Sequence, residues 1–565
     1  MNRRDPLMRK WLILFLMIFL LAGCVSAHGE APAEEEKPED VFSYTVLEDG
    51  TAEITGYTGK ETVISVPDTL NGYPVTSIGE KAFLDKTRIS EITIPESVNR
   101  IGAGAFSGCR SLTAVHIPES VTALETGVFS DCVRLADFTI PDSITVIGDS
   151  AFSGCESLAG ITVPDSVTAI GAGAFSGCSS LAEFTVPDGV LEIGDLAFSG
   201  CAKLATVHIA DSVVRMGCGV FTDCEILTSV RLPAGITRIE KQTFSECVAL
   251  TEVTIPESVL EIGEKAFQDC VSLTGIVIPD SVVSIEDSAF LGCIALTELV
   301  IPDSVASIGA NPFELCSALT GLSVSPDHPY LEIRDGVLYS RPDFRLISYP
   351  YGSEADTFAI PQGVREIGAM AFIDCSRLTS VTVPDSVTVI GNYAFTFCSS
   401  LETMVLPDSV TRIGQNAFSW CKSLSGITVP DSVTFIGRNA FTGCESLTSF
   451  VIPEGIGAIE PFTFAWCTGL PAIVIPDSVT VIGDNAFQHC ESLTAVIVPE
   501  SVTAIGRFAF QDCTSLQSII IPDSVTAVGR DFLAGCPELT AVVSPDSAAQ
   551  KYCSAKKIRY TFPEE

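Results

Sequence analysis

The chain has 565 residues, with 32 Lys and Arg against 70 Asp and Glu, and a formal net charge of −38. So acidic a chain repels phosphate backbones and anionic lipid surfaces, which excludes nucleic acid as a partner and direct docking on a membrane. Its 21 cysteines would suggest disulfides in an exported protein, so their spacing decides how they are interpreted.

The first 23 residues predict export. Four basic residues precede an apolar run over residues 11–21, which is typical of a signal peptide and too short to span a bilayer. The "LAGC" that ends at Cys24 resembles a bacterial lipobox, which implies cleavage before Cys24 and a lipid on its thiol. The alternative is an ordinary signal peptide followed by a chance cysteine. Residues 24–40 are acidic and contain proline, which predicts a disordered tether behind the lipidated Cys24.

A 23-residue phrase then recurs along most of the chain. Cysteines fall at every 23rd position from Cys109 to Cys316 and again from Cys375 to Cys536. A phenylalanine stands three residues before each of them, except that Leu533 replaces it in the last unit. No insertion occurs inside a unit, and this strictness is the signature of a stacked array in which each unit covers the apolar face of the next.

One unit predicts a strand, a turn and a short return. The stretch from Leu112 to Ile117 alternates apolar and polar residues, as a strand does, and Pro118 ends it because proline cannot donate to a ladder. Glu119 and Ser120 supply turn chemistry. The following "GAGAFSGC" is short and rich in glycine, which favours a single 3₁₀ or α turn.

These residues resemble the BspA-like leucine-rich repeat with its "IPxSVTxIGxxAFxxC" consensus, over roughly residues 41–560. The resemblance implies an α/β repeat solenoid, a right-handed leucine-rich-repeat coil with a parallel β-sheet on its concave face and a short helical, 3₁₀ or irregular convex limb. With the repeat spacing, it divides the chain into an N-terminal β-cap with a first degenerate repeat (41–94), a first array (95–324), an insertion (325–360), a second array (361–543) and a C-terminal cap (544–565).

The insertion interrupts the period with 36 extra residues. Residues 336–339 and 344–349 are rich in β-forming residues and are separated by "SRPD", which predicts a β-hairpin projecting from the solenoid. It carries Tyr330, Tyr339, Tyr349 and Tyr351, which are available for contacts.

One cysteine per unit, always in the same phase and never as C-x-x-C, argues for a buried column of free thiols rather than for zinc or disulfides. Cys218 and Cys553 lie outside this column and are expected to be the more reactive thiols. The five histidines are scattered, and no serine has His and Asp partners at a useful spacing. We therefore expect no enzyme activity, no cofactor and no metal.

Two surface features of the second array are candidate binding residues. The residue just before the repeat cysteine is mostly Gly or Asp in the first array but becomes aromatic later, at Phe397, Trp420, Trp466 and His489. An aliphatic stripe is predicted on the concave strands at Val451, Val474, Ile497, Ile520 and Val543. Each has a plain structural alternative: the aromatics pack back onto the limb, and the stripe reflects β-propensity alone.

The function that fits is a surface-anchored, non-catalytic binding protein. Members of the resembled family are similar to bacterial adhesins, which implies adhesion to host proteins or other cells, with the lipid holding a monomeric chain on the outside of the cell envelope. The alternatives are capture of glycans as nutrients and a structural spacer in the envelope. The ligand is therefore an extracellular protein or glycan that the sequence does not name.

Overall fold

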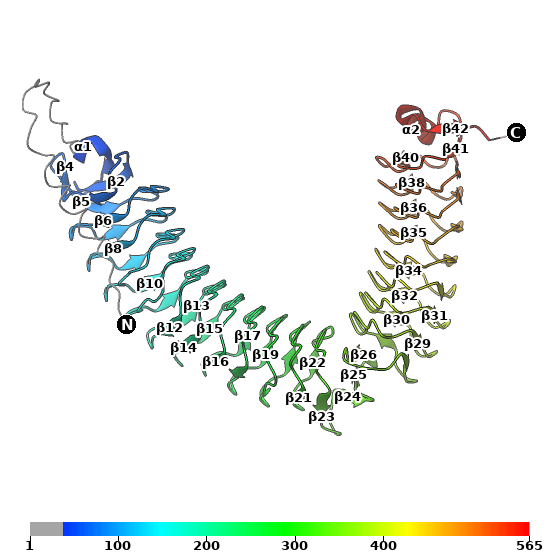
Figure 1. Ribbon diagram of the computed structural model, residues 1–565, viewed down its shortest axis with the longest axis horizontal. Coiled ribbons are helices and arrows are strands. Elements are labelled where there is room, and N and C mark those ends of the chain that lie inside the picture. The colour runs from blue at the N-terminus through cyan, green and yellow to red at the C-terminus, as the bar shows by residue number, and fades with distance from the viewer. Residues whose placement is uncertain (1–37, 564–565) are drawn as a thin grey trace, which may run out of the picture.

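The computed structural model describes residues 38–563, which form one continuous coil wound into a wide arc (Figure 1). Each 23-residue repeat makes one turn, so that residues 23 apart lie side by side; Phe184 pairs with Val207 and Thr185 with His208. The structure contains two short helices and otherwise strands and turns. The predicted leucine-rich-repeat coil is confirmed.

The first ladder of parallel strands is formed by the alternating segment that precedes each repeat proline. Along the chain, side chains in these strands alternate between exposed and buried, as in the "EFTV" of β12. The strands of this ladder are β3 (Val63–Ser65), β6 (Glu91–Thr93), β8 (Ala114–His116), β12 (Glu183–Val186), β14 (Thr206–Ile209), β16 (Ser229–Arg231), β18 (Glu252–Thr254), β21 (Glu298–Ile301), β23 (Gly321–Val324), β27 (Thr357–Ala359), β29 (Ser380–Thr382), β31 (Thr403–Val405), β33 (Gly426–Thr428), β37 (Ala495–Ile497), β39 (Ser518–Ile521), β41 (Thr540–Val543) and β42 (Arg559–Thr561).

A second parallel ladder, which the sequence analysis missed, is formed by the two residues that precede the repeat glycine. The second residue of each pair is a core aliphatic such as Ile170, while the first faces outward or is half-buried. Its strands are β7 (Arg100–Ile101), β9 (Ala123–Leu124), β10 (Val146–Ile147), β11 (Ala169–Ile170), β13 (Glu192–Ile193), β15 (Arg215–Met216), β17 (Arg238–Ile239), β19 (Glu261–Ile262), β20 (Ser284–Ile285), β22 (Ser307–Ile308), β28 (Glu366–Ile367), β30 (Val389–Ile390), β32 (Arg412–Ile413), β34 (Phe435–Ile436), β35 (Ala458–Ile459), β36 (Val481–Ile482), β38 (Ala504–Ile505) and β40 (Ala527–Val528).

Glycine follows most of the second-ladder strands, where the backbone of the preceding coil approaches closely; glutamate follows β9, β17, β20 and β35. A Cβ placed on Gly171 would lie 2.5 Å from the backbone nitrogen of Asp149 in the preceding coil. The chain then turns into a third limb, which is neither the 3₁₀ nor the α turn that was predicted. Alternate backbone N–H groups donate to the next coil, as from Gly173 to Asp195 O (2.7 Å) and from Phe175 to Ala197 O (2.8 Å). Those between them close single turns within the coil, as from Ser176 to Gly173 O (3.0 Å).

The first ladder lies on the outer side of the arc and not on the predicted concave face. Figure 1 shows β12, β14 and β16 along the outer edge, with β13, β15 and β17 inside them. The prediction assumed a wider helical limb opposite the strands, and no such limb is present among the described residues. The third limb is itself hydrogen-bonded from coil to coil at about the strand spacing of 4.8 Å, so nothing opposite the first ladder holds the coils further apart there.

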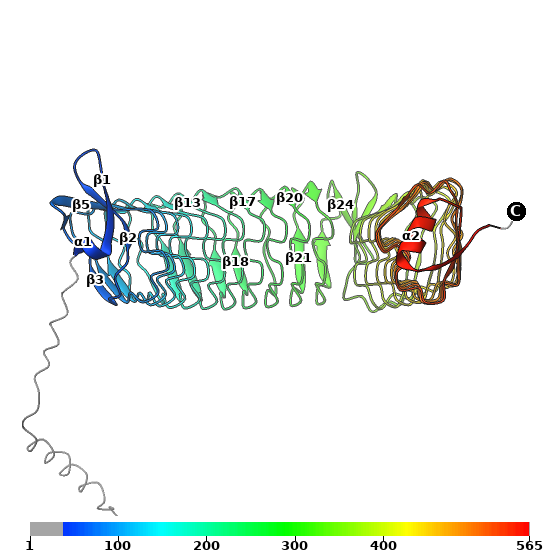
Figure 2. The same ribbon diagram turned by 90° about the horizontal axis from the view of Figure 1, so that it is seen from above.

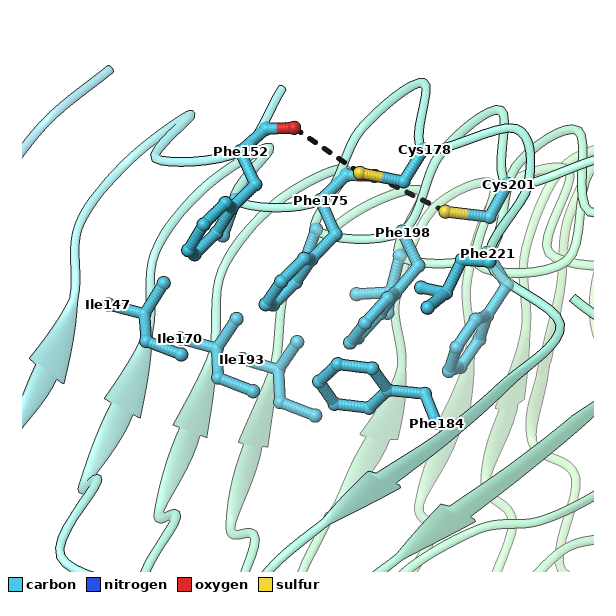
Figure 3. Close-up of a cluster of buried hydrophobic side chains, with 14 of the residues drawn as sticks. Ile147, Phe152, Ile170, Phe175, Cys178, Phe184, Ile193, Phe198, Cys201 and Phe221 are labelled. Atoms are coloured by element: carbon cyan, nitrogen blue, oxygen red, sulfur yellow. Dashed lines mark hydrogen bonds between the residues drawn. The ribbon is translucent and has the colours of Figure 1, made fainter. Parts of the chain in front are cut away.

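The core is a stack of identical side chains, one set from each coil (Figure 3). The repeat phenylalanines lie parallel, with Phe152 and Phe175 at a ring-centroid distance of 5.4 Å and Phe175 and Phe198 at 5.5 Å. The repeat thiols lie beside them, and Cys178 Sγ donates to the backbone oxygen of Phe152 at 3.2 Å. The column of buried free thiols predicted from the spacing is therefore present, with Cys536 at the end of the array only partly buried.

The inserted segment joins the two arrays, whereas the sequence analysis describes it as a projecting hairpin. It forms β24 (Leu331–Arg334), β25 (Val337–Ser340) and β26 (Arg345–Ser348); β24, β25 and β26 pair antiparallel in that order, and β26 then pairs in parallel with β28. Leu338 and Ile347 pack on the first array, while Tyr339 and Tyr349 pack on the second. The insertion thus separates two hydrophobic cores at the bend of the arc (Figure 1).

Both ends of the described coil are covered. At the N-terminal end, α1 (Pro38–Val41), β1 (Phe42–Val46), β2 (Ala52–Tyr57), β4 (Thr69–Leu70) and β5 (Tyr73–Ile78) precede the regular repeats. At the C-terminal end, α2 (Ala548–Lys556) lies across the last coil (Figure 2), burying Ala549 and Cys553. Ser547 caps this helix by accepting a hydrogen bond from Gln550 N.

Candidate binding face of the second array

The third limb of every coil contains two positions with left-handed backbone, two residues before and two residues after the core phenylalanine. In the first array these positions include Gly173 and Gly177, with φ of 58° and 72°, on either side of Phe175. Glycine adopts this conformation without penalty, and Asn and Asp adopt it more readily than other residues do, because a Cβ otherwise crowds the following carbonyl. Small residues are therefore expected at both positions.

The second array places aromatic side chains at these left-handed positions. Phe397, Trp420, Trp466 and His489 occupy the position after the core phenylalanine, with φ of 63°, 61°, 63° and 58°. A positive φ in a bulky residue is uncommon and costs about 1–2 kcal/mol. Phe397 is 48% exposed and Trp466 is 41% exposed, while Trp420 and His489 are half-buried. The four residues therefore share one face of the solenoid, on four coils out of five.

The position before the core phenylalanine adds three aromatics that the sequence analysis did not select. Tyr393, Phe462 and Phe508 have φ of 59°, 60° and 57° and are half-buried. Arg530 lies over the Phe508 ring, with its Cζ 5.3 Å from the ring centroid. The sequence signal for this column was the glycine at the same phase in earlier units, such as Gly104, because a column of glycines indicates positive φ. We call the seven side chains together the aromatic face: Tyr393, Phe397, Trp420, Phe462, Trp466, His489 and Phe508.

The rings of the aromatic face lean toward the following coil. Trp420 lies over Gly443, since a Cβ built on that glycine would meet indole atom Cε3 at 2.6 Å and Cδ2 at 2.7 Å. Lys422 Nζ is 5.5 Å from the Trp420 ring and forms an ion pair with Glu445 at 3.0 Å. Trp466 stacks on His489 with ring centroids 3.8 Å apart and an interplanar angle of 24°.

The aliphatic stripe is exposed over most of its predicted length. Val451, Val474 and Ile497 are 72%, 78% and 66% exposed, and Ile520 is 39% exposed. Val543 is a correction, because it is fully buried. The pairing of β39 with β41 shifts by one residue relative to the 23-residue period, so that Ile520 pairs with Val542 and Val543 turns into the core. Because the first ladder lies on the outer side of the arc, this stripe does not line the concave face.

The remaining predicted positions are dispersed. Cys24, predicted to carry a lipid, lies outside the described residues. Cys218 is exposed as expected, but Cys553, a residue of α2, is buried in the second hydrophobic core. Within residues 38–563 no His, Cys, Asp or Glu side chains gather in a group of three or more that could hold a metal ion. No helix in the same range has the length and apolarity needed to cross a bilayer.

Comparison with known proteins decides the family. The family model described as "BspA type Leucine rich repeat region (6 copies)" matches residues 76–205, 191–320, 348–470 and 434–555. The chain belongs to the BspA-type leucine-rich repeat family. The resemblance seen in the repeat phrase is thereby confirmed. A search of curated proteins finds no match for this BspA-type chain.

Solved bacterial leucine-rich repeat structures resemble this BspA-type protein. A leucine-rich repeat protein from Bacteroides ovatus is 32% identical, with 72% of this chain and 92% of that chain covered and a TM-score of 0.45. A leucine rich cell surface protein from Faecalibacterium prausnitzii is 25% identical, with 93% and 97% covered and a TM-score of 0.30. The pneumococcal vaccine antigen PcpA is 15% identical, with 93% and 97% covered and a TM-score of 0.28.

Proposed function

We propose that this protein is a non-catalytic binding protein on the bacterial cell surface, where it adheres to macromolecules of other cells or of its surroundings. The observation that carries the proposal is the aromatic face. Phe397 and Trp466 are large, exposed and held in a backbone conformation that costs about 1–2 kcal/mol each. Strain that persists at exposed positions is typical of a site retained for its function.

The surface location is supported by two observations outside the aromatic face. The basic, apolar and "LAGC" segments that end at Cys24 have the order of a lipoprotein export signal. The similar protein from Faecalibacterium prausnitzii is described as a cell surface protein. A lipid on Cys24 would hold the solenoid at the envelope, since its net charge of −38 gives it no attraction to anionic lipids.

The test replaces the aromatic face without disturbing the core. Phe397, Trp420 and Trp466 are changed together to Asn, which other coils carry at the left-handed positions, as at Asn439. The matched control changes the exposed Val277 and Val300 of the first array to Thr. Binding to whole cells, matrix proteins and glycans is then measured for both variants and for the unchanged protein.

We expect the aromatic triple variant to lose binding by at least about tenfold, because one exposed aromatic anchor contributes about 1–2 kcal/mol or more to an interface. The control is expected to bind as the unchanged protein does. Full binding by the triple variant would refute the proposed role of the aromatic face. Absence of any binding by the unchanged protein would instead favour a spacer.

A further inference from the structure

Each indole of the aromatic face packs against a group of the following coil. For Trp466 the covering group is the imidazole of His489, which in turn places Nε2 3.6 Å from Asp512 Oδ2. For Trp420 it is Gly443, and Lys422 Nζ also lies over the ring, 5.5 Å from its centroid. Trp466 is 41% exposed and Trp420 is half-buried. We call these two rings the platforms, since the exposed part of each is available for stacking, with the Lys422 ammonium beside the Trp420 ring.

The platforms repeat along the axis of the coil. Trp420 and Trp466 occupy the same phase of units that lie two turns apart. At a spacing of about 4.8 Å per coil, the two indoles are separated by about 10 Å along the axis. This is close to the length of two sugar units in an extended glycan chain, so a polymer with a disaccharide period would meet the two rings in register.

Hydrogen-bonding groups accompany the platforms on the same limb. Asn485 Nδ2 donates to Gln488 Oε1 at 2.8 Å, and Gln488 Nε2 donates to Gln511 Oε1 at 2.9 Å. This chain of amides runs along the axis beside the coil that carries His489. Amides both donate and accept, and can therefore serve the hydroxyl groups at the rim of a sugar ring.

We propose that the aromatic face binds an extended glycan chain laid along the solenoid axis, with sugar rings stacked on Trp420 and Trp466. One face of a pyranose is a flat array of C–H groups surrounded by hydroxyls, which complements an open indole bordered by amides. The inference rests on the proposed function and specifies its ligand. The separation of about 10 Å between the two rings, which matches a disaccharide repeat, is the observation that favours a glycan over a protein ligand.

Tryptophan fluorescence provides a direct readout, because the sequence has only three tryptophans: Trp11, Trp420 and Trp466. In the full chain carrying Trp11→Phe, all indole emission comes from the two platforms. The probes are cellohexaose, chitohexaose and mannohexaose, with the corresponding disaccharides. The variants are Trp466→Asn, Trp466→Phe as a ring-preserving control, and Val277→Thr with Val300→Thr, two exposed residues of the first array, as a distant control.

We expect at least one hexasaccharide to shift the emission and to bind more tightly than its disaccharide, by about 3- to 10-fold for the second stacked ring. The affinity for the hexasaccharide should fall by a similar factor in Trp466→Asn and by a smaller factor in Trp466→Phe. It should be unchanged in the distant control. Equal affinity for hexasaccharide and disaccharide would overturn the two-platform arrangement.

The failure of this inference is distinguishable from that of the proposed function. If no hexasaccharide binds while the unchanged protein still adheres to cells or proteins through Phe397, Trp420 and Trp466, the glycan assignment is wrong and the proposed function stands. If adhesion survives replacement of all three residues, the proposed function fails as well.

Discussion

At the scale of single residues, the side chains at the left-handed positions of the third limb affect the stability of the fold and the binding of a ligand in different ways. Although Leu196, Gln242 and Lys265 also stand there in the first array, Gly, Asn or Asp occupies more than half of these positions and adopts a positive φ at low cost. The aromatic residues of the second array do not. Replacing them is therefore expected to affect stability and binding in opposite directions, which is unusual for large hydrophobic side chains.

Phe397→Asn is the sharpest test, because no aromatic partner contacts its exposed ring among the described residues. We expect the variant to be more stable by about 0.5–1 kcal/mol, since Asn relieves the strain of φ 63°. The measurement is the urea midpoint of the full chain. Phe395→Asn, which removes a buried core ring in the same coil, should lower the midpoint sharply. A lower urea midpoint for Phe397→Asn would show that the packing of the Phe397 ring stabilises the protein by more than the backbone strain costs.

Sequence patterns predicted many residues correctly and failed where backbone register changed. The buried repeat cysteines and phenylalanines were predictable because a strict period forces each into the same environment. The 23-residue period predicts an exposed Val543. The prediction is wrong because the pairing of β39 with β41 shifts by one residue relative to that period. Cys553 was expected to be reactive, but it lies on the buried side of α2, and a cap that occurs only once gives no periodic signal from which this burial could be predicted.

At the scale of elements, the thiol column behaves as one titrating unit. Burial raises the pKa of Cys155 and Cys201 to about 12, from a usual value near 9, with the backbone hydrogen bond opposing the shift. The folded state therefore stays protonated when the unfolded chain ionises. Stability is unaffected by these thiols below about pH 9 and falls as pH rises from there toward 12, because the unfolded state then binds fewer protons.

We expect the urea midpoint to fall steeply between pH 8.5 and 10.5, with each buried thiol contributing about 1 kcal/mol per pH unit above pH 9. Other groups titrate in this range, so the control is Cys178→Ala with Cys201→Ala. That variant should be less stable at pH 7 but should show a shallower alkaline slope. An identical slope in both proteins would contradict the assignment.

The elements that sequence analysis missed are those too short to show a pattern. A strand of two residues, such as β11, has no alternation to detect, and its existence follows only from the stacking of neighbouring coils. The insertion was recognised as β-structure from its composition. The insertion joins the arrays because Leu338 packs in the first core and Tyr339 in the second. That arrangement could not be predicted without knowing that a core lies on each side of the insertion.

At the scale of the whole molecule, the arc is a series of coils that contact only their neighbours, and its ends need covers. In α2 the Tyr552 ring lies 4.5 Å from the ring of Phe532, and Ala549 is fully buried. A chain ending at residue 543 would expose this apolar end and the edge of β41. We expect it to self-associate, as detected by light scattering during size-exclusion chromatography.

The matched control for this truncation keeps the chain length and changes only the exposed Lys551 and Lys557 to Gln. It should remain as monodisperse as the unchanged protein. A monodisperse truncated chain would show that the last coil prevents self-association without the cap formed by α2.

The regularity of the core has a consequence for how such a protein changes over generations. Except in the last unit, each repeat from Phe106 onward offers its neighbour the same phenylalanine, leucine and thiol, so one such coil fits against another. Unequal recombination between the near-identical gene segments would therefore add or delete whole turns without leaving a hole in the interior. The reach of the molecule can lengthen or shorten in one genetic step, while outward-facing residues diversify turn by turn.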